Sequence, residues 1–416
     1  MMRSLFAAVS GLKTHQQRMD VIGNNIANVN TVGFKRSRVN FQDLLNQTIR
    51  GASRPVAGGR GGTNPMQVGL GVSLGSIDLI MDGSSLQDTG KATDLGIEGD
   101  GFFILSDGGR TYYTRVGTFD FGEDGSLVSL LNGMRVQGWM PDNPDTLTDI
   151  RININESESA KATTKMVIGG NLDSRVPIYD DTNPDQTPKS RVLLRHTVYD
   201  SKGQEYIVTI ELTKNDENKW TWELVTVEDS AGRDIGAGTQ TGVINFNNDG
   251  TYQGVDNNTI SFEPVGSDQV NITLDFSKLT QYGSDHDAAV ESQDGYKSGV
   301  LDSYTIDQNG NIIGVFSNGV TRILGQIALA RFANPAGLLK EGNSLYSITS
   351  NSGSPLVGTA NSGGFGSIKP GSLEMSNVDL STEFTDMIIT QRGFQANSRV
   401  ITASDEMLQE LVNLKR

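Results

Sequence analysis

The sequence predicts a mainly β protein with α-helical termini, in which nested β domains lie between N- and C-terminal helices able to form coiled coils. Two observations support this fold class. Near each end of the chain, apolar residues recur at an interval of seven, the period at which one helix can lie along another. Between the ends, many of the 49 Gly punctuate short alternating runs of apolar and polar residues, which are typical of strands and tight turns.

The repeats define two apolar stripes, one in each predicted terminal helix. The N-terminal stripe consists of Leu5, Leu12, Met19 and Ile26. The C-terminal stripe consists of Leu380, Met387, Phe394, Ile401 and Leu408. Because such residues return to one seam of a helix, we expect both stripes to serve in assembly. The first helix should begin near Ser4, a good N-cap residue, and end near Asn28.

Two interpretations of the helical ends remain open. The ends either pack against each other within one molecule, or stay loose until neighbouring copies cover their outer faces. Isolated helices are marginal in water because ordering the chain costs entropy. The ends also differ in charge: residues 1–50 hold seven Lys or Arg against two Asp, whereas residues 371–416 hold four Lys or Arg against seven Asp or Glu.

The composition argues against several classes of protein. A net charge of -15 disfavours nucleic-acid binding, and the chain has no Cys for disulfides or thiolate metal sites. Because no long apolar run is present, we expect no membrane span. The apolar segment 5–12 is followed at once by Lys13, His15 and Arg18 without a convincing cleavage site. We therefore expect a helix there and no cleaved signal peptide.

Turn signals and changes in composition divide the chain into five segments. Residues 51–62, rich in Gly and Arg, predict a linker or extended arm after the first helix. Short strands such as Phe102–Leu105 and Met134–Gln137, separated by Asp-Gly and Asn-Gly turns, mark a first β domain. The expected segments are 1–67 for the N-terminal helix and arm, 68–145 and 294–365 for the two halves of the first β domain, 146–293 for an inserted β domain, and 366–416 for the C-terminal helix.

One hairpin gives the clearest signal in the inserted domain. Its first strand places Tyr206, Val208, Ile210 and Leu212 on one face. Its second strand places Trp220, Trp222 and Leu224 on one face. The pattern predicts that two of the three Trp residues of the chain are buried in the core of this domain.

The sequence offers little support for catalysis or cofactor binding. The three His are scattered, and His286, between Asp285 and Asp287, is more typical of a solvated loop than of a metal site. The acidic turn around Asp124 lacks the final Glu of an EF-hand, so we expect a turn without calcium. No nucleophile elbow, zinc-protease motif or phosphate loop is present. We expect no enzyme activity, no cofactor and no metal.

The segment 24–35 carries the most specific motif of the chain. It contains Asn24, Asn25, Ile26, Ala27, Asn28, Thr31, Gly33, Phe34 and Lys35. This string closely resembles the N-terminal signature of the bacterial flagellar rod and hook proteins. It suits a helix that ends and turns at Gly33, with Phe34 as an anchor and Lys35 on a solvated stretch together with Arg36 and Arg38.

Further segments strengthen the resemblance to this family. Gly99–Phe103, continuing to Tyr113–Arg115, is similar to its strand block, and 371–380 with 391–398 and 405–408 is similar to its C-terminal helix. The insert of roughly 150 residues, within the usual size of a domain, is similar to the outer domain of the hook members, which the rod members mostly lack. Residues 304–310 and 326–335 also resemble the hook members.

The resemblance implies a structural subunit of the flagellar hook, a homopolymer forming a curved, flexible tube that acts as a universal joint. The terminal helices would line the inner tube. Implied partners are the type III export apparatus, the distal rod protein, the hook cap protein and the hook-filament junction protein. The subunit would be extracellular and exported without a cleaved signal peptide. A distal-rod axial protein is the near alternative, and an exported β-rich adhesin or glycan-acting enzyme is the alternative from another class.

Overall fold

The computed structural model describes residues 2–54, 61–153, 157–179 and 190–414. The chain forms two compact units. The first consists of Met1–Asn153, Thr305–Ile313 and Ile323–Arg416, and the second consists of Ile154–Tyr304 and Gly314–Arg322. The second unit is thus inserted in the sequence of the first, and both ends of the chain belong to the first unit.

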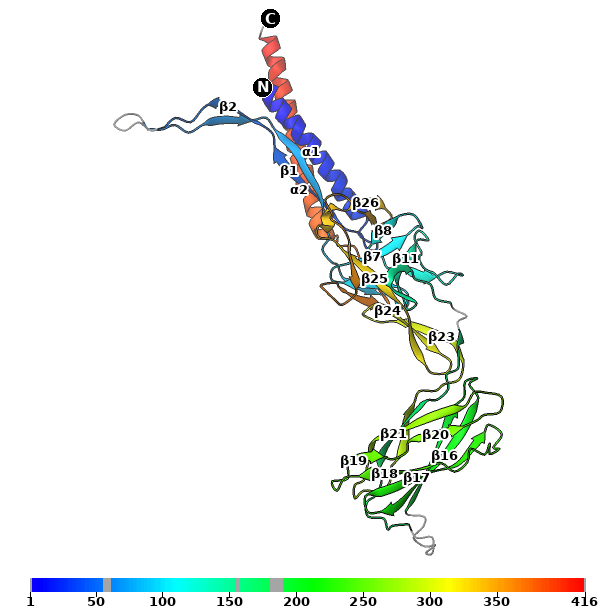
Figure 1. The fold of residues 1–416 in the computed structure, drawn as a ribbon. Coiled ribbons are helices and arrows are strands. Elements are labelled where there is room, and N and C mark those ends of the chain that lie inside the picture. The colour runs from blue at the N-terminus through cyan, green and yellow to red at the C-terminus, as the bar shows by residue number, and fades with distance from the viewer. Residues whose placement is uncertain (1, 55–60, 154–156, 180–189, 415–416) are drawn as a thin grey trace. The chain divides into compact units, whose positions relative to one another are not determined.

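Two long helices come from the two ends of the chain and lie side by side (Figure 1). Helix α1 spans Met2–Ala27 and helix α2 spans Leu380–Asn413. Ser4 lies inside α1, so its prediction as an N-cap was wrong, because the helix begins one turn earlier than the apolar repeat suggests. Within the described parts of the chain, no helix combines the length and the apolar character needed to cross a membrane.

Helix α2 is capped by Asp379, whose carboxylate accepts a hydrogen bond of 3.0 Å from the backbone N–H of Ser381. This is the usual chemistry of an N-cap, because the first N–H groups of a helix lack partners within it. The helix therefore begins well after the expected start of the C-terminal helical segment at 366. The intervening residues form two short strands, β29 (Ser367–Pro370) and β30 (Ser372–Glu374).

The predicted linker or extended arm is a two-stranded ribbon (Figure 1). Strand β1 (Ser37–Asp43) pairs antiparallel with β4 (Val72–Leu79), and β2 (Asn46–Arg50) pairs with β3 (Met66–Gly69). Every residue of β2 and β3 is exposed. Residues 55–60, at the centre of the predicted linker, lie outside the described residues.

The β body of the first unit is built on a sheet with the strand order β24-β25-β11-β7-β8-β27-β26. Strands β9, β10, β12 and β28 attach to this sheet, while β6 pairs with β29 and β5 with β30. The remaining bounds are β5 (Leu86–Asp88), β6 (Leu95–Glu98), β7 (Phe102–Ser106), β8 (Thr111–Thr114), β9 (Phe119–Phe121), β10 (Leu127–Ser129), β11 (Arg135–Met140), β12 (Asn143–Asp149), β24 (Asn311–Phe316), β25 (Thr321–Arg331), β26 (Leu339–Gly342), β27 (Leu345–Ser347), β28 (Leu356–Thr359) and the 3-10 helix η2 (Pro335–Gly337).

The core of this body contains a cluster of aromatic rings. The ring of Phe102 meets those of Phe332 and Tyr346 edge to face, each at 5.8 Å between centroids. Tyr113 meets Phe332 in the same manner at 4.8 Å. Such contacts stabilise the core beyond the burial of apolar area. The predicted strands Phe102–Leu105 and Met134–Gln137 both contribute to this sheet as β7 and β11.

The second unit packs two sheets on a single apolar core. One sheet has the order β15-β16-β17-β18-β19 and the other the order β20-β21-β14-β22. The bounds are β13 (Ser157–Glu158), β14 (Lys165–Asn171), β15 (Arg191–Tyr199), β16 (Glu205–Asp216), β17 (Lys219–Asp229), β18 (Thr241–Phe246), β19 (Tyr252–Val255), β20 (Thr259–Phe262), β21 (Val270–Thr280), β22 (Ala289–Gln293) and β23 (Gly299–Ile306). Trp220 and Trp222, on β17, are completely buried, which confirms the predicted hairpin core.

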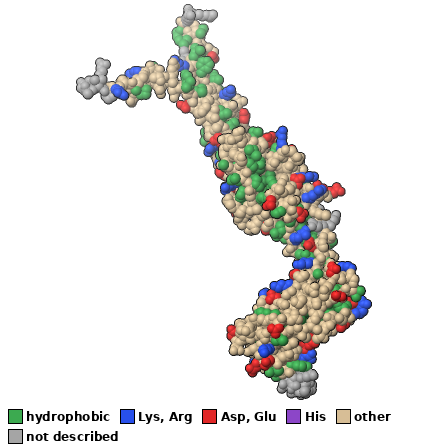
Figure 2. All heavy atoms as spheres, viewed as in Figure 1, with side chains coloured by type: hydrophobic (Ala, Val, Ile, Leu, Met, Phe, Trp, Pro, Cys, Tyr) green, Lys and Arg blue, Asp and Glu red, His purple; other side chains and the backbone are tan. Residues whose placement is uncertain are grey.

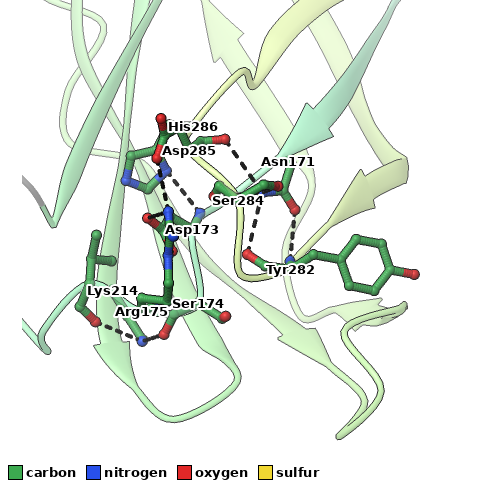
Figure 3. Close-up of polar contacts among 10 residues, drawn as sticks. Asn171, Asp173, Ser174, Arg175, Lys214, Tyr282, Ser284, Asp285 and His286 are labelled. Atoms are coloured by element: carbon green, nitrogen blue, oxygen red, sulfur yellow. Dashed lines mark hydrogen bonds and ion pairs between the residues drawn. The ribbon is translucent and has the colours of Figure 1, made fainter.

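A polar network in the second unit holds the loop after β21 (Figure 3). Nδ1 of His286 accepts a hydrogen bond of 3.0 Å from the backbone N–H of Asp173, and its ring lies edge to face on Trp220. The loop is solvated as predicted at Asp285 and Asp287, which are exposed, whereas the ring of His286 itself is half-buried because it packs on the core. Asn171 donates to Ser284 Oγ at 2.8 Å, and Arg175 joins Asp173 to Asp285. Among the described residues, no group of three His, Asp or Glu could hold a metal ion.

Candidate assembly surfaces at the two chain ends

The seam between α1 and α2 is built from small and polar residues. The buried residues of α1 are Ala8, Gly11, Thr14, Ile22 and Asn25. The buried residues of α2 are Glu383, Thr390 and Ser404. Within α1 these positions are three or eight residues apart and within α2 seven or fourteen, and only Ala8 and Ile22 carry an apolar side chain. The completely buried part of the contact between the helices is therefore mostly small or polar.

Two glycines allow the helices to approach closely. A Cβ atom at Gly11 would lie 2.8 Å from Nδ2 of Asn397, and a Cβ atom at Gly393 would lie 2.6 Å from Cε1 of His15. The contacts also show that the helices run antiparallel, since the residue numbers rise along α1 as they fall along α2. Because glycine has only a hydrogen in place of a side chain, Asn397 and His15 can each lie against the backbone of the opposite helix.

Charged and amide groups fix the register of the helical pair. Arg18 forms an ion pair of 3.0 Å with Asp386, at a partly exposed position. Asn25, almost fully buried, donates from Nδ2 to both carboxylate oxygens of Glu383 at 3.2 Å. Arg36 lies 3.9 Å from the same carboxylate. A buried carboxylate is costly without such donors, so these residues select one alignment of the two helices.

The predicted apolar stripes alternate with the buried positions of this seam at intervals of three and four residues, and most of their side chains are only partly buried. Leu5, Leu12, Met19 and Ile26 are half-buried, as are Met387, Ile401 and Leu408. Leu380 and Phe394 are exposed, at 39% and 37% of their surface. The intrachain contact thus covers both stripes only in part.

A second apolar face on α2 was missed by the sequence reasoning. It carries Ile389, Val400, Met407 and Leu411, whose exposed fractions range from 41% to 54%. These residues, with Ala396 and Ala403 between them, recur at intervals of three, four or seven residues and so lie on one face of the helix. On α1, Met2 and Phe6 are each 66% exposed. Hydrophobic side chains accordingly gather on the visible surface of the helical pair (Figure 2).

The signature segment 24–35 forms a clasp with the C-terminal segment 374–377. The backbone N–H of Gly33 donates to the carbonyl of Glu374 at 2.8 Å, and that of Asn377 donates to the carbonyl of Phe34 at 3.3 Å. Gly33 has a φ of +65°, and a Cβ atom there would lie 2.8 Å from Val116 Cγ2. Only glycine suits both the left-handed backbone and the close approach.

The other signature residues have distinct local roles. The side chain of Asn25 accepts from the backbone N–H of Ser37 at 3.0 Å and donates to its carbonyl at 2.8 Å, which ties α1 to the start of β1. Asn28 donates to the carbonyl of Asn24 at 2.9 Å and accepts from Thr31 at 3.1 Å, which closes the end of the helix. Ala27 ends α1, and Ile26 belongs to the half-buried stripe described above.

Lys35 contradicts the prediction of a solvated position. Its side chain is fully buried, and Nζ lies 2.7 Å from Oε1 of Glu374. The ring of Phe34 is also buried, as predicted for an anchor, and Nζ of Lys340 lies 3.9 Å from its centroid. The error arose because the partner of Lys35 lies more than three hundred residues away, where no local pattern points to it.

Four family descriptions match the chain. They are "Flagella basal body rod protein" at residues 5–35, "Flagellar hook protein FlgE/F/G D1 domain" at 96–171, "Flagellar basal body protein FlaE D2 domain" at 171–296, and "Flagellar basal body rod FlgEFG protein C-terminal" at 369–414. The first and last of these cover α1 and α2, the helices that carry the assembly surfaces.

Two proteins and one solved structure show the extent of the similarity. The chain is 44% identical to the flagellar hook protein FlgE of Borreliella burgdorferi and 41% identical to that of Treponema pallidum, over 100% of each pair of chains. The crystal structure of the Helicobacter pylori flagellar hook protein FlgE2 has a TM-score of 0.56 at 16% identity, covering 70% of this chain and 100% of that one. The fold of FlgE2 therefore matches that of this protein over 70% of the chain.

Proposed function

Because this chain belongs to the flagellar hook protein family and is a structural subunit of the hook, we propose that it polymerises through its paired terminal helices into a curved, flexible tube. The tube would transmit torque while bending, as a universal joint. The family is a structural one, and we expect no catalytic activity from this chain.

The apolar face of α2 is the observation that carries this proposal. Ile389, Val400, Met407 and Leu411 lie exposed along one helix with the spacing of a coiled-coil seam. Contiguous apolar surface of this kind marks a site of protein association. The α1–α2 seam supports the same interpretation, since its completely buried residues are mostly small or polar and its apolar stripes stay partly exposed in an isolated molecule.

The charges of the two helices favour a head-to-tail contact between copies. Arg3 and Lys13 are exposed on α1, whereas Asp405, Glu406 and Glu410 are exposed on α2. A contact between α1 of one copy and α2 of the next would join surfaces of opposite charge. Such heterologous contacts generate open helical polymers when the rotation between copies does not close a ring.

Each part of the chain receives a place in this polymer. We assign α1 and α2 to the inner wall of the tube, the β body of the first unit to the middle layer and the second unit to the outside. The second unit carries many solvent-exposed ion pairs, such as Arg195–Glu228 and Lys278–Glu291, which suit wet contacts that neighbours can exchange as the tube bends.

The family also suggests a route of assembly. We assign export to the type III apparatus without a cleaved signal peptide, and an extracellular location in the hook. The expected neighbours are copies of this chain, the distal rod protein at one end, and the hook cap protein and hook-filament junction protein at the other.

Electron microscopy of the purified full-length chain tests the proposal. The wild type should form curved, flexible tubes at high concentration. The double variant Val400→Glu, Met407→Glu places charge on the apolar face and should abolish tubes, while the control Gln395→Glu, at an exposed polar position on another face of α2, should leave them intact. Straight rods would instead favour a distal-rod protein. Tubes formed equally well by the double variant would refute the role of this face.

A further inference from the structure

The base of the two helices contains a buried cluster of three charged side chains. Lys35 and Glu374 are fully buried, and Arg115 is 3% exposed. Nζ of Lys35 lies 2.7 Å from Oε1 of Glu374, and Nη1 of Arg115 lies 3.4 Å from Oε2. The cluster unites the N-terminal signature, the end of strand β8 and strand β30, three segments far apart in the sequence.

Glu374 is the anion shared by both cations. Its carboxylate also accepts a hydrogen bond of 3.1 Å from the backbone N–H of Ser84. The other partners of the two cations are neutral: Lys35 donates to the carbonyl of Asp82 at 2.8 Å, and Arg115 donates to that of Gly99 at 2.9 Å. The guanidinium of Arg115 also lies 5.2 Å from the ring centroid of Phe102.

Removal of the Glu374 charge would leave two buried cations with no carboxylate in direct contact, and only the more distant carboxylate of Asp82 would still favour the charged form of Lys35. An uncompensated charge in a protein interior is strongly destabilising, whereas a cluster whose charges stay balanced avoids that cost. Because two cations share one carboxylate here, the loss of one cation still leaves a balanced pair. Burial already lowers the pKa of Lys35, and the nearby Glu374 opposes that shift. The stability of the cluster therefore depends on the carboxylate supplied by the C-terminal segment.

The cluster lies directly beneath the clasp that joins the two chain ends. In this clasp, Gly33 is hydrogen-bonded to Glu374, and Phe34 is hydrogen-bonded to Asn377. The backbone N–H of Arg36 adds a hydrogen bond of 2.8 Å to Oδ1 of Asn377. These residues link the end of α1 to the chain just before α2. The position of both helices relative to the β body thus depends on the same few residues.

We propose that Lys35, Arg115 and Glu374 form an electrostatic lock that closes the N-terminal signature onto the β body only when the C-terminal segment is in place. Lys35 enters the interior together with the carboxylate of Glu374. Both helices are thereby fixed at a common base in one cooperative step. For its polymerisation readout, this inference rests on the proposed function; the lock itself is a property of the single chain.

Amide hydrogen exchange on the dilute full-length chain tests the lock. The reporters are the backbone N–H groups of Gly33, Ser84 and Asn377, and the amides of the second unit show whether that unit stays folded. Glu374→Gln, nearly identical in shape, should speed exchange at all three reporters at least tenfold, with the second unit unchanged. The matched control Asp88→Asn removes an exposed carboxylate from β5, the strand paired with β30, and should change exchange by less than threefold.

A second variant separates charge from packing. Lys35→Met removes one cation and leaves the Arg115–Glu374 pair balanced, so the reporters at Gly33 and Asn377 should stay within threefold of the wild type. A lock based on shape alone predicts the reverse order, with the less similar Met causing the greater loss. That order, or a Glu374→Gln chain that exchanges like Asp88→Asn, would overturn the inference.

Polymerisation supplies a separate readout. Glu374→Gln should lower the amount of sedimented polymer at least tenfold, and Asp88→Asn should not; equal polymer from both variants would contradict the assigned control of helix position. If the wild type itself formed no polymer, the proposed function would fail, while the exchange measurements would still decide whether the lock exists.

Discussion

The imidazole ring of His15 on α1 rests on Gly393 of α2, so closely that a Cβ atom at position 393 would lie 2.6 Å from Cε1 of the ring. His15 also meets the ring of Phe41 edge to face, at 5.5 Å between centroids. The imidazole therefore joins α1, α2 and the ribbon strand β1 at one point of the seam.

The substitution Gly393→Val tests how tightly this point is packed. The new side chain must displace the ring of His15, and overpacking of this kind typically costs about 1–3 kcal/mol. We expect a lower helix content by circular dichroism and a higher concentration threshold for polymer formation. Unchanged values for both would show that the seam opens freely to admit larger residues.

The substitution Gly23→Ala should act in the opposite direction. Gly23 lies within α1, and a Cβ atom there would have no neighbour within 4 Å. Alanine stabilises a helix interior by about 0.5–1 kcal/mol relative to glycine. We expect a higher helix content in the dilute chain, and loss of polymer by this variant would reveal a contact with another copy at this position.

The seam should weaken in mild acid because of His15. Burial, with a smaller effect of Arg18, lowers the pKa of this imidazole below its usual 6.5. The unfolded ends then bind a proton more readily than the paired helices, so seam stability falls as the pH drops below about 6.5 and levels off below the folded pKa. Helix content measured between pH 8 and 5 should follow this course.

The variant His15→Gln is the control for that titration. It retains a polar side chain of similar length but cannot gain a proton in this range. We expect its helix content to be much less dependent on pH than that of the wild type. An equal pH dependence in both chains would assign the effect to another group.

The second unit should resist acid to a much lower pH. Hydrogen bonds from Arg175 hold the pKa of Asp173 at about 2, and hydrogen bonds led by Lys165 hold that of Asp275 at about 2. Because both values lie below the usual 3.8, the stabilisation is present above pH 3.8 and is lost as the pH falls through 2. The fluorescence of Trp220 and Trp222 should report this transition.

Trp139→Phe makes that fluorescence specific to the second unit, because Trp139 belongs to the first. Adding Asp173→Asn in this background should raise the pH of the transition. A transition at the same pH in both chains would contradict the role given to the Asp173–Arg175 pair.

Local patterns predicted much of the β fold and the fold class, which the structure confirms. Alternating apolar residues placed Trp220 and Trp222 in a core because strand geometry sends every second side chain to one face. The helical seam escaped the same reasoning. Its buried positions, such as Gly11 and Thr14, are small or polar, and a search for apolar repeats selects their larger neighbours Leu5 and Leu12 instead.

The sequence by itself determined the two helical ends, the β character of the middle and the family signature, because each rests on the spacing or identity of nearby residues. The tertiary structure alone decided that Lys35 is buried against Glu374 and that α2 presents a separate apolar face. Both depend on segments that lie far apart along the chain and meet only after folding, when burial and charge compensation select one arrangement among many.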